Sequence, residues 1–400
     1  MRDTSAAKPQ PSVGAVIISH NPGADLGVCL DALEDQDSRL TDIIIVDNAS
    51  SDGIPEAATR RRVRCILNPE NRGFARAANQ GLAALETEVA LVLNPDVRLE
   101  SDAVSAIRDA FRSNERIGIV GCLLRRRDGS IQHFGGWMRM PDCSPFHDDR
   151  IDTTRGAETI RDVDFVTGAA IALRRTCVAP IGGFDEAYFL YYEDADLCFR
   201  ARNAGWRVIV SPHFRGIHDE STVANRDMSV KIRNHHEGRL RFMLRHRSLA
   251  EIVRDVRFTE RGLAALAATD EERAILRGVW ADWSERLRAS PGDRRTPLHE
   301  IGQILRALAE EYVLPATSSA RQPSPSPLAP GSLASPVPIA GGLITWMRRR
   351  WNEVSTRWYV DPALRQQDEI NRQVAEALRN LESRLLHLER RDRPSHAPEE

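Results

Sequence analysis

The chain has 400 residues, 42% of them hydrophobic and 28% charged, with a formal net charge of −2 at pH 7. This length predicts roughly two to three domains, and the near-zero charge excludes the broad basic surface typical of nucleic-acid binding. Because residues 1–12 lack an apolar core and no run reaches the ~20 apolar residues of a membrane span, we expect a cytoplasmic protein without a signal peptide.

Short apolar runs alternate with helix-like segments through the first 120 residues. Runs typical of buried parallel strands lie at residues 13–19, 43–46, 65–67, 89–93 and 117–120. Helical spacing follows most of them, at residues 25–36, 71–81 and 101–113. Two more strands are expected later, at residues 166–174 and 208–210. This alternation predicts an α/β fold with an open, mostly parallel sheet flanked by helices.

The rest of the chain is expected to be irregular and then helical. Residues 125–163 are polar, with a hairpin turn at Asp128–Gly129. An amphipathic, arginine-rich helical extension follows, then a stretch rich in proline and serine typical of a linker. The tail fits a short coiled coil, a helical hairpin packed on itself, or a helix on an anionic membrane surface. The predicted parts are a disordered arm (1–12), a sheet domain (13–228), the helical extension (229–315), the linker (316–342) and the tail (343–400).

The cysteines and most histidines do not form a recognisable metal or disulfide pattern. The six cysteines are scattered without a Cys-x-x-Cys pair, so we expect buried free thiols. His213, His235 and His236 are taken as structural residues.

Residues 182–207 carry five carboxylates among aromatic residues, and the rest of the site is organised around them. Glu193 and Asp194 open a predicted helix, where the helix dipole should keep them ionised at neutral pH. An ionised carboxylate beside an apolar site can accept a proton from a hydroxyl nucleophile. The aromatic run at 189–192 should bury the approach to this pair, whereas Asp196 is explained equally well as a cap on a surface helix.

Polar loops follow three of the predicted strands. They bring Ser19 and Asn21 after the first strand, Asp47 after the second, and Asn94 and Asp96 after the fourth. Ligands of open α/β sheets bind at the carboxyl ends of the strands, so these loops should converge on one crevice. Asp47 could accept hydrogen bonds from a base or ribose there, and Asp96 could hold a divalent cation against a diphosphate leaving group. With Asp194 deprotonating an incoming hydroxyl, the arrangement describes displacement at a sugar anomeric carbon with inversion.

Several motifs in this order resemble the inverting GT-A glycosyltransferases of family 2, especially the rhamnosyltransferase-like branch. The matching pieces span about residues 13–245 and read VIISHN, VDNASSDG, NRGFARAANQG, LNPDV, VTGAAIALRR and GGFDEAYFLYYEDADLCFRARNAGW.

The resemblance implies roles for individual residues. It implies that Asp47 contacts the nucleobase or ribose, that Asn71 and Asn79 line the nucleotide side, and that Asp194, beside Glu193, is the catalytic base. Asn94-Pro95-Asp96 stands where most relatives carry Asp-x-Asp, which leaves one carboxylate in place of two. His218 matches a histidine that completes the metal or diphosphate site in some relatives; a purely structural role for it stays open.

The resemblance also implies the reaction. The expected enzyme moves a sugar, with rhamnose as the branch-based choice, from a nucleotide diphosphate donor to a surface polysaccharide or lipid-linked acceptor. It would use Mg²⁺ or Mn²⁺, work in the cytoplasm at the inner face of the membrane, and contact the membrane or a second copy through its C-terminal helices.

Two alternative functions agree less well with the sequence. A dinucleotide-dependent oxidoreductase would carry Gly-x-Gly-x-x-Gly after the first strand, but the sequence there is Ser19-His20-Asn21-Pro22-Gly23. A non-catalytic nucleotide-binding scaffold in a polysaccharide-assembly complex is opposed by the intact Glu193–Asp194 pair.

Overall fold

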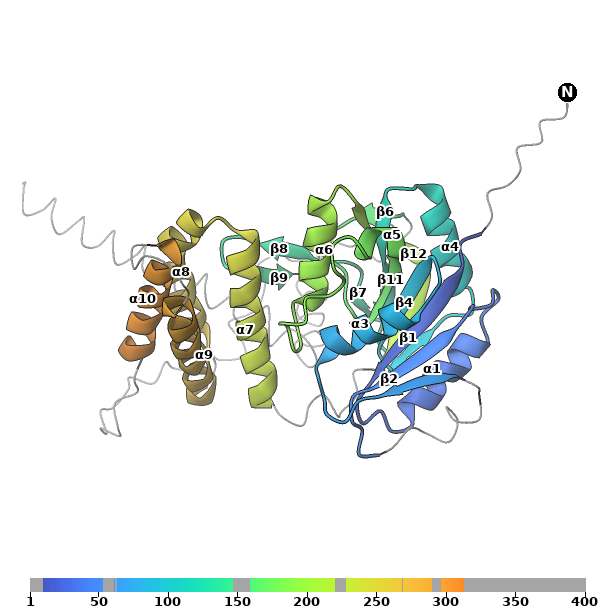
Figure 1. Ribbon diagram of the computed structural model, residues 1–400, viewed down its shortest axis with the longest axis horizontal. Coiled ribbons are helices and arrows are strands. Elements are labelled where there is room, and N and C mark those ends of the chain that lie inside the picture. The colour runs from blue at the N-terminus through green and yellow to red at the C-terminus, as the bar shows by residue number, and fades with distance from the viewer. Residues whose placement is uncertain are drawn as a thin grey trace, which may run out of the picture.

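The structure, a computed structural model, covers the sheet and most of the helical extension. The described residues are 10–52, 61, 63–146, 159–219, 228–267, 269–289 and 296–312. The predicted linker and tail, and most of the predicted arm, lie outside them. A sheet with flanking helices lies beside a group of further helices (Figure 1).

Parallel strands form one half of the sheet, as the alternating pattern predicts. β1 (Val13–Ser19) lies between β2 (Ile43–Asp47) and β4 (Val89–Leu93), and β2 pairs with β3 (Arg64–Leu67). The other half is mixed, because β11 (Ala170–Arg174) runs antiparallel between β4 and β6 (Ile117–Arg125). β6 pairs in parallel with β12 (Arg207–His218), and three short strands complete the sheet: β5 (Val97–Leu99), β7 (Ile131–His133) and β10 (Arg161–Asp162).

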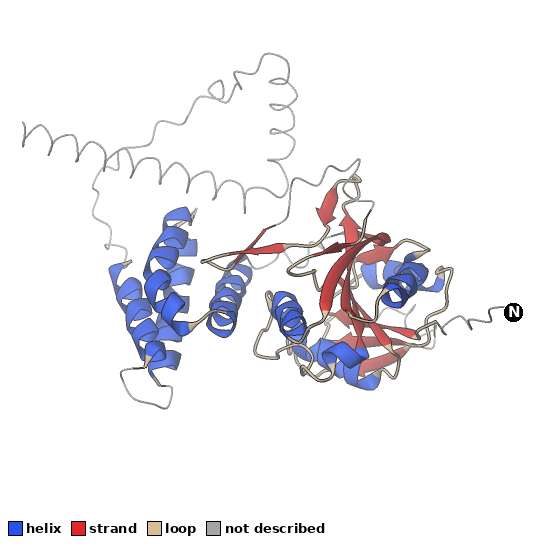
Figure 2. Ribbon diagram, turned by 90° about the horizontal axis from the view of Figure 1, so that it is seen from above, coloured by secondary structure: helices blue, strands red, loops and turns tan. Residues whose placement is uncertain are grey.

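Helices cover both faces of the sheet (Figure 2). One apolar cluster joins a face to α1 (Asp25–Glu34) and α4 (Ala103–Ser113). A second cluster joins the opposite face to α3 (Phe74–Ala84), the short α5 (Arg175–Val178) and α6 (Glu193–Asn203). The predicted fold class, a mostly parallel α/β sheet with a helical extension, is confirmed.

The strand predictions were incomplete at one edge of the sheet. The strand expected at 208–210 runs from Arg207 to His218, and β5 was not predicted. β12 shifts register between Ser211 and Arg215, around Pro212 and His213, which interrupt the apolar pattern. A bulge absorbs such residues without ending a strand, so a search for continuous apolar runs stops too early.

The helical extension comprises α7 (Met228–His246), α8 (Leu249–Leu266), α9 (Asp270–Arg288) and α10 (Pro297–Glu311). Capping boxes at Ser248–Glu251 and Thr269–Glu272 start α8 and α9 by satisfying their first backbone N–H groups. None of the helices in the described ranges is both long and apolar enough to cross a membrane.

A buried ion pair joins the extension to a small hairpin of β8 (Trp137–Arg139) and β9 (Ser144–Phe146). Arg239 of α7 is 1% exposed and donates to both carboxylate oxygens of Glu260 at 2.6 and 2.7 Å. It also donates to the carbonyl of Asp142 at 3.0 Å, while Trp280 of α9 donates to Glu260 at 2.7 Å. One guanidinium thus ties the hairpin to α7, α8 and α9.

The six cysteines are free, as expected, and five of them are buried. Cys65 on the edge strand β3 is exposed.

His235 of α7 links stability to pH. Burial, together with the positive charge of Arg239, lowers the pKa of His235 from its ordinary 6.5 to about 4. The folded state therefore holds this imidazole neutral. Its contribution to the free energy of unfolding is complete above pH 6.5 and is lost as the pH falls toward 4. We predict that His235→Gln removes about 2 kcal/mol of the stability difference between pH 7.5 and pH 5.

Urea unfolding of both proteins at the two pH values measures this difference. An equal loss of stability in wild type and variant on acidification would contradict the assignment.

Candidate active site

The carboxyl ends of the central parallel strands meet at one edge of the sheet. Ser19 at the end of β1 is the register partner of Asp47 at the end of β2, and Ile17 is the partner of Leu93, which Asn94 follows. The topology therefore brings Ser19, Asp47 and Asn94 to the same edge.

The loops after β1 and β2 lock onto each other. Asp47 is 6% exposed and accepts hydrogen bonds from the hydroxyl and the backbone N–H of Ser50. The backbone N–H of Asn21 donates to Ser50 Oγ at 2.8 Å, and Asn21 Oδ1 accepts from the backbone N–H of Ser51 at 2.7 Å. The hydroxyl of Ser19 is buried with no hydrogen-bond partner among the residues that the structure describes. The crevice floor is thus prearranged and keeps one free polar group.

Asn48 is a site residue that the sequence analysis missed. It is 3% exposed, its backbone N–H donates to the Ser19 carbonyl, and its amide donates to the Gly73 carbonyl at 3.1 Å. Asn68 donates to Asn48 Oδ1 at 2.9 Å. Asn48 therefore holds the loops after β1, β2 and β3 together; its place beside Asp47 in a loop of turn formers was the only available signal.

Asn71 and Asn79 both have protein partners. Asn71 accepts a hydrogen bond from the backbone N–H of Gly73 at 3.0 Å and so shapes its own loop. The Asn79 amide makes two bonds with the backbone of Phe184, accepting at 2.9 Å and donating at 2.8 Å, and it also donates to Glu186. These bonds give Asn79 a clamping role between α3 and the loop before α6.

Asp96 and His218 lie together because β5 and β12 pair. His218 is the register partner of Val97, and its Nε2 lies 3.3 Å from Asp96 Oδ1. On the other side of the ring, Nδ1 lies 3.0 Å from Gln132 Oε1, a contact that orients the ring with Nε2 toward Asp96. Burial and the negative charges of Asp96 and Asp219 raise the pKa of Asp25 nearby, so this corner is electronegative.

The Asp96–His218 pair fits a cation that is shared with a diphosphate. No group of three or more His, Cys, Asp or Glu side chains arranged for a metal occurs in the described part of the chain. Mg²⁺ at nucleotide sites commonly takes one or two protein ligands and fills its remaining positions with phosphate oxygens and water. One carboxylate and one imidazole nitrogen directed at it are therefore a sufficient protein contribution.

An unusual turn places the acidic pair. Tyr191 and Tyr192 have φ angles of +71° and +70°, a left-handed conformation that non-glycine residues seldom adopt. The Tyr192 hydroxyl donates to the Cys143 carbonyl at 2.9 Å, and its ring packs against His235 and Phe242 of α7. The strained turn is therefore held by the hairpin and the helical extension.

This turn buries Glu193 and leaves Asp194 partly buried. Asp194 accepts hydrogen bonds from the backbone N–H of Gly168 at 2.9 Å and of Ala195 at 2.7 Å. Glu193 is 5% exposed, and its Oε2 has no partner in the described ranges. Burial raises the pKa of both carboxyls, and the charge of Asp194 raises the pKa of Glu193 further.

Burial opposes the helix dipole that was expected to keep the pair ionised, and it does so most strongly at Glu193, whose pKa lies well above its ordinary value. Two backbone donors stabilise the charged form of Asp194, whereas Glu193 lacks such support at Oε2. Asp194 is therefore the better placed of the two carboxyls to carry a negative charge. A charged, desolvated carboxylate with a raised pKa has the properties of a general base.

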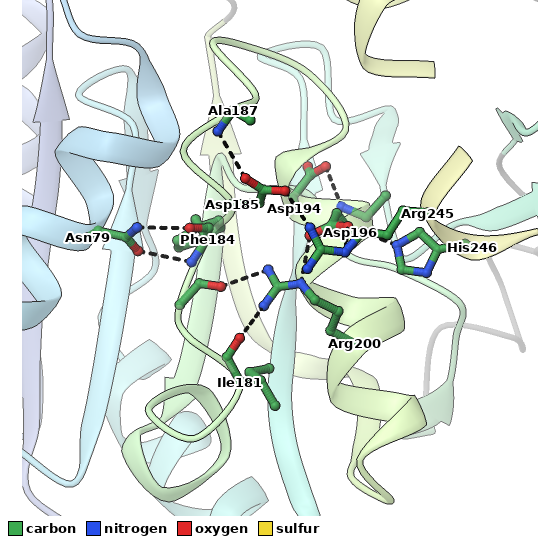
Figure 3. A network of polar contacts seen from close by, with 12 residues as sticks. Asn79, Ile181, Phe184, Asp185, Ala187, Asp194, Asp196, Arg200, Arg245 and His246 are labelled. Atoms are coloured by element: carbon green, nitrogen blue, oxygen red, sulfur yellow. Dashed lines mark hydrogen bonds and ion pairs between the residues drawn. The ribbon is translucent and has the colours of Figure 1, made fainter. Parts of the chain in front are cut away.

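Asp196 is not a cap on a surface helix; it is fully buried at the centre of a charged network (Figure 3). It accepts hydrogen bonds from Arg200 at 2.7 Å and His246 at 2.8 Å, with Arg245 at 3.4 Å. Burial alone would raise the pKa of Asp196, but His246 and Arg200 bring it below the ordinary value. Arg200 also donates to the carbonyls of Ile181 and Gly183. Asp196 therefore connects α6 to α7 and to the loop that Asn79 clamps.

Comparison with known proteins finds one matching family and several similar rhamnosyltransferases. Residues 15–178 match the family described as Glycosyl transferase family 2. The chain is 29% identical over 293 residues to an N-acetylglucosaminyl-diphospho-decaprenol L-rhamnosyltransferase of Mycobacterium tuberculosis, covering 66% of this chain and 93% of that protein. It is 25% identical over 249 residues to rhamnosyltransferase WbbL of Escherichia coli, covering 59% of this chain and 94% of WbbL.

Solved structures resemble the chain more distantly. GalNAc-T7 in a structure with UDP, GalNAc and Mn²⁺ matches with a TM-score of 0.48 and 12% identity, covering 77% of this chain and 57% of that one. The mannosyltransferase PcManGT of Pyrobaculum calidifontis with GDP-Man and Mn²⁺ matches with a TM-score of 0.44 and 18% identity, covering 76% of this chain and 87% of that one.

The Tyr192 hydroxyl should contribute to stability. We predict that Tyr192→Phe lowers the free energy of unfolding by about 1 kcal/mol, because the Cys143 carbonyl loses its donor. Tyr188→Phe is the matched control, since the Tyr188 hydroxyl is buried without a partner among the described residues and its removal should be neutral or stabilising. Urea denaturation of the two variants decides, and equal destabilisation would refute the assigned bond.

Proposed function

We propose that the chain, whose residues 15–178 match glycosyl transferase family 2, transfers a sugar with inversion from a nucleotide diphosphate to a hydroxyl of a lipid-linked glycan. The observation that carries this proposal is the Glu193–Asp194 pair, with Glu193 buried and Asp194 held partly buried next to Gly168 by a strained turn. The ordered loops at the strand ends support a donor nucleotide on the other side of the site.

Asp194 is the proposed catalytic base. In a single displacement the acceptor hydroxyl attacks the anomeric carbon, its proton passes to Asp194 Oδ1 or Oδ2, and the bond to the diphosphate oxygen breaks. Desolvation raises the pKa of Asp194, and the N–H groups of Gly168 and Ala195 support its charged form. Glu193, whose own pKa is raised further, is proposed to stay protonated so that only one negative charge occupies the start of α6.

The donor nucleotide is proposed to lie over the loops after β1, β2 and β4. Asp47, with the free hydroxyl of Ser19 nearby, can receive hydrogen bonds from the base or ribose, and Asn21, Asn71 and Asn94 border the same edge. Because Asn79 is fully engaged with Phe184, we now propose a positioning role for it and no nucleotide contact.

Asp96 and His218 are the proposed ligands of a divalent cation, Mg²⁺ or Mn²⁺. When bound, the cation would neutralise charge that develops on the leaving diphosphate. Asp96 would supply an anionic oxygen, and His218 a nitrogen whose direction the Gln132 contact fixes.

Donor and acceptor are proposed from the relatives. Their names indicate rhamnose as the transferred sugar and an N-acetylglucosaminyl diphospholipid as one acceptor class. We adopt both for this chain, together with a location at the inner face of the cell membrane, where such an acceptor would be found.

A nucleotide-sugar panel tests the function directly. We expect deoxythymidine-diphosphate rhamnose with Mn²⁺ to raise the melting temperature most and to be hydrolysed slowly. The same protein should transfer rhamnose to a short-chain N-acetylglucosaminyl diphospholipid. Binding of nucleotide sugars without hydrolysis or transfer to any acceptor would favour a non-catalytic scaffold.

Substitution of Asp194 should lower the transfer rate far more than substitution of Glu193. We predict that Asp194→Asn lowers the transfer rate ~10²- to 10⁴-fold, since the base is lost, while affinity for the nucleotide stays within about threefold. Glu193→Gln should retain most activity, because glutamine imitates the protonated acid. Rates measured against pH should fall on acidification around an apparent pKa above the usual 3.8 of aspartate. Wild-type turnover by Asp194→Asn would move the base elsewhere.

The cation proposal has its own test. We predict that Mn²⁺ raises the melting temperature of the wild type in the presence of a nucleotide diphosphate, and that Asp96→Asn and His218→Gln raise the Mn²⁺ concentration required at least ~10-fold. His213→Gln, on an exposed part of β12, is the control and should change nothing. Full transferase activity in excess chelator would remove the cation from the proposal.

A further inference from the structure

A small pocket lies between the loop before α6 and the helices α7 and α9. Its volume is about 40 Å³, and its lining comes from the Ala187–Leu190 loop, the Asn234–Arg241 stretch of α7, and Trp283 of α9. None of the residues proposed for the nucleotide, the cation or the base lines it. Gly238 of its lining lies against the Tyr191 backbone and the Tyr192 ring, so the pocket adjoins the turn that places the acidic pair.

Two residues of this lining carry buried donors that lack partners. Tyr188 is 2% exposed and Trp283 is 7% exposed. The Tyr188 hydroxyl and the Trp283 indole nitrogen are both without a hydrogen-bond partner within the ranges that the structure describes. Unsatisfied buried donors are costly, and a site that keeps two of them gains free energy when a ligand supplies acceptors.

The face of α7 that lines the pocket adds both hydrogen-bond donors and acceptors. Asn234, Glu237 and Arg241 recur at spacings of three and four residues and so share one helix face. The Arg241 guanidinium lies 5.6 Å from the Tyr188 ring and 5.4 Å from the Trp283 ring, and it makes no ion pair with any acid that the structure describes. Glu237 forms ion pairs with Arg233 at 3.0 Å and Arg286 at 4.0 Å, and its carboxylate oxygens keep further acceptor capacity.

This combination of unpaired donors, a guanidinium and a carboxylate favours one class of ligand. A phosphate would meet the Glu237 carboxylate, and an apolar chain would leave every polar group unsatisfied. Hydroxyl groups both donate and accept, so they can match Glu237 as well as the unpaired donors. Phe189 at the rim is 44% exposed and offers an apolar surface for the C–H face of a ring. On this measure one water needs about 10–15 Å³, so a volume near 40 Å³ admits about three water-sized groups, which suits the hydroxyl-bearing edge of a sugar and not a whole ring.

We propose that this pocket binds the hydroxyl edge of a sugar residue of the acceptor, away from the reacting hydroxyl, and so contributes to acceptor choice. The inference rests on the proposed transferase function for its biological setting, but the binding itself can be tested without turnover.

Two variants of the pocket lining and one matched control provide the kinetic test. Trp283→Phe keeps an aromatic ring and removes the indole N–H, and Asn234→Ala removes the amide. Each should raise KM for the N-acetylglucosaminyl diphospholipid about 3- to 10-fold, the range expected for one lost hydrogen bond. Hydrolysis of the nucleotide sugar by water, which needs no acceptor sugar, should keep its kcat and KM. Trp280→Phe, one turn earlier on α9, is the control: it loses a bond to Glu260, so it should lower the melting temperature and leave the acceptor KM unchanged.

Nuclear magnetic resonance provides the binding test. The Trp283 indole N–H signal, assigned by its absence from Trp283→Phe, should shift when N-acetylglucosamine is titrated into the full chain. Inorganic pyrophosphate at the same concentration should leave it in place. The shift should also be lost in Asn234→Ala.

The outcomes separate this inference from the proposed function. An indole signal that does not move with sugar, or that moves with pyrophosphate instead, overturns the pocket assignment, as do unchanged acceptor KM values in both variants. If the wild type neither hydrolyses nor transfers any nucleotide sugar, the transferase proposal fails, while the titration still decides whether the pocket binds a sugar.

Discussion

The position of the acidic pair depends on two consecutive tyrosines in a left-handed backbone conformation. Such a conformation costs of order 1–3 kcal/mol per residue, so it persists only where surrounding contacts hold it. Here the contacts are the Tyr192–Cys143 hydrogen bond and the packing of both tyrosine rings against α7. The turn starts α6 so that Glu193 is buried and the partly buried Asp194 accepts a hydrogen bond from Gly168. Strain, burial and raised basicity therefore arise from one local geometry.

The helical extension takes part in the site through a second set of contacts. Asp196 lies two residues beyond Asp194 and is bound to His246 and Arg245 near the end of α7. Arg200 carries the connection to the loop at 181–185, and Asn79 carries it onward to α3 on the nucleotide side. A displacement of α7 would therefore be felt at both the base and the donor loops. The extension acts as a support for the acidic pair and as one wall of the neighbouring pocket.

The sequence was sufficient for the sheet and for the meeting of its loops, because buried strands and turn formers leave strong local signals. Asp47 and Asp96 could be placed at strand ends from topology alone, and the structure brings His218 next to Asp96 through strand pairing. The protonation of Glu193 and Asp194 could not be predicted, since it depends on burial by distant segments. The burial of Asp196, the clamp made by Asn79 and the role of Asn48 were missed for the same reason: each depends on partners 20 or more residues away in the chain.

The match to the family ends at residue 178, whereas α6 begins at Glu193. The matched segment thus holds the nucleotide loops and the first cation ligand but neither the base nor the helix that supports it. A recombinant fragment cut at residue 178 would lose β12, the strand that pairs with β5 and β6 and brings His218 to Asp96. A chimera that exchanges everything after β11 would keep the left-handed turn together with α7. It would separate the turn from the Cys143 carbonyl of the hairpin and Asp194 from Gly168, so both sides of that junction have to be matched.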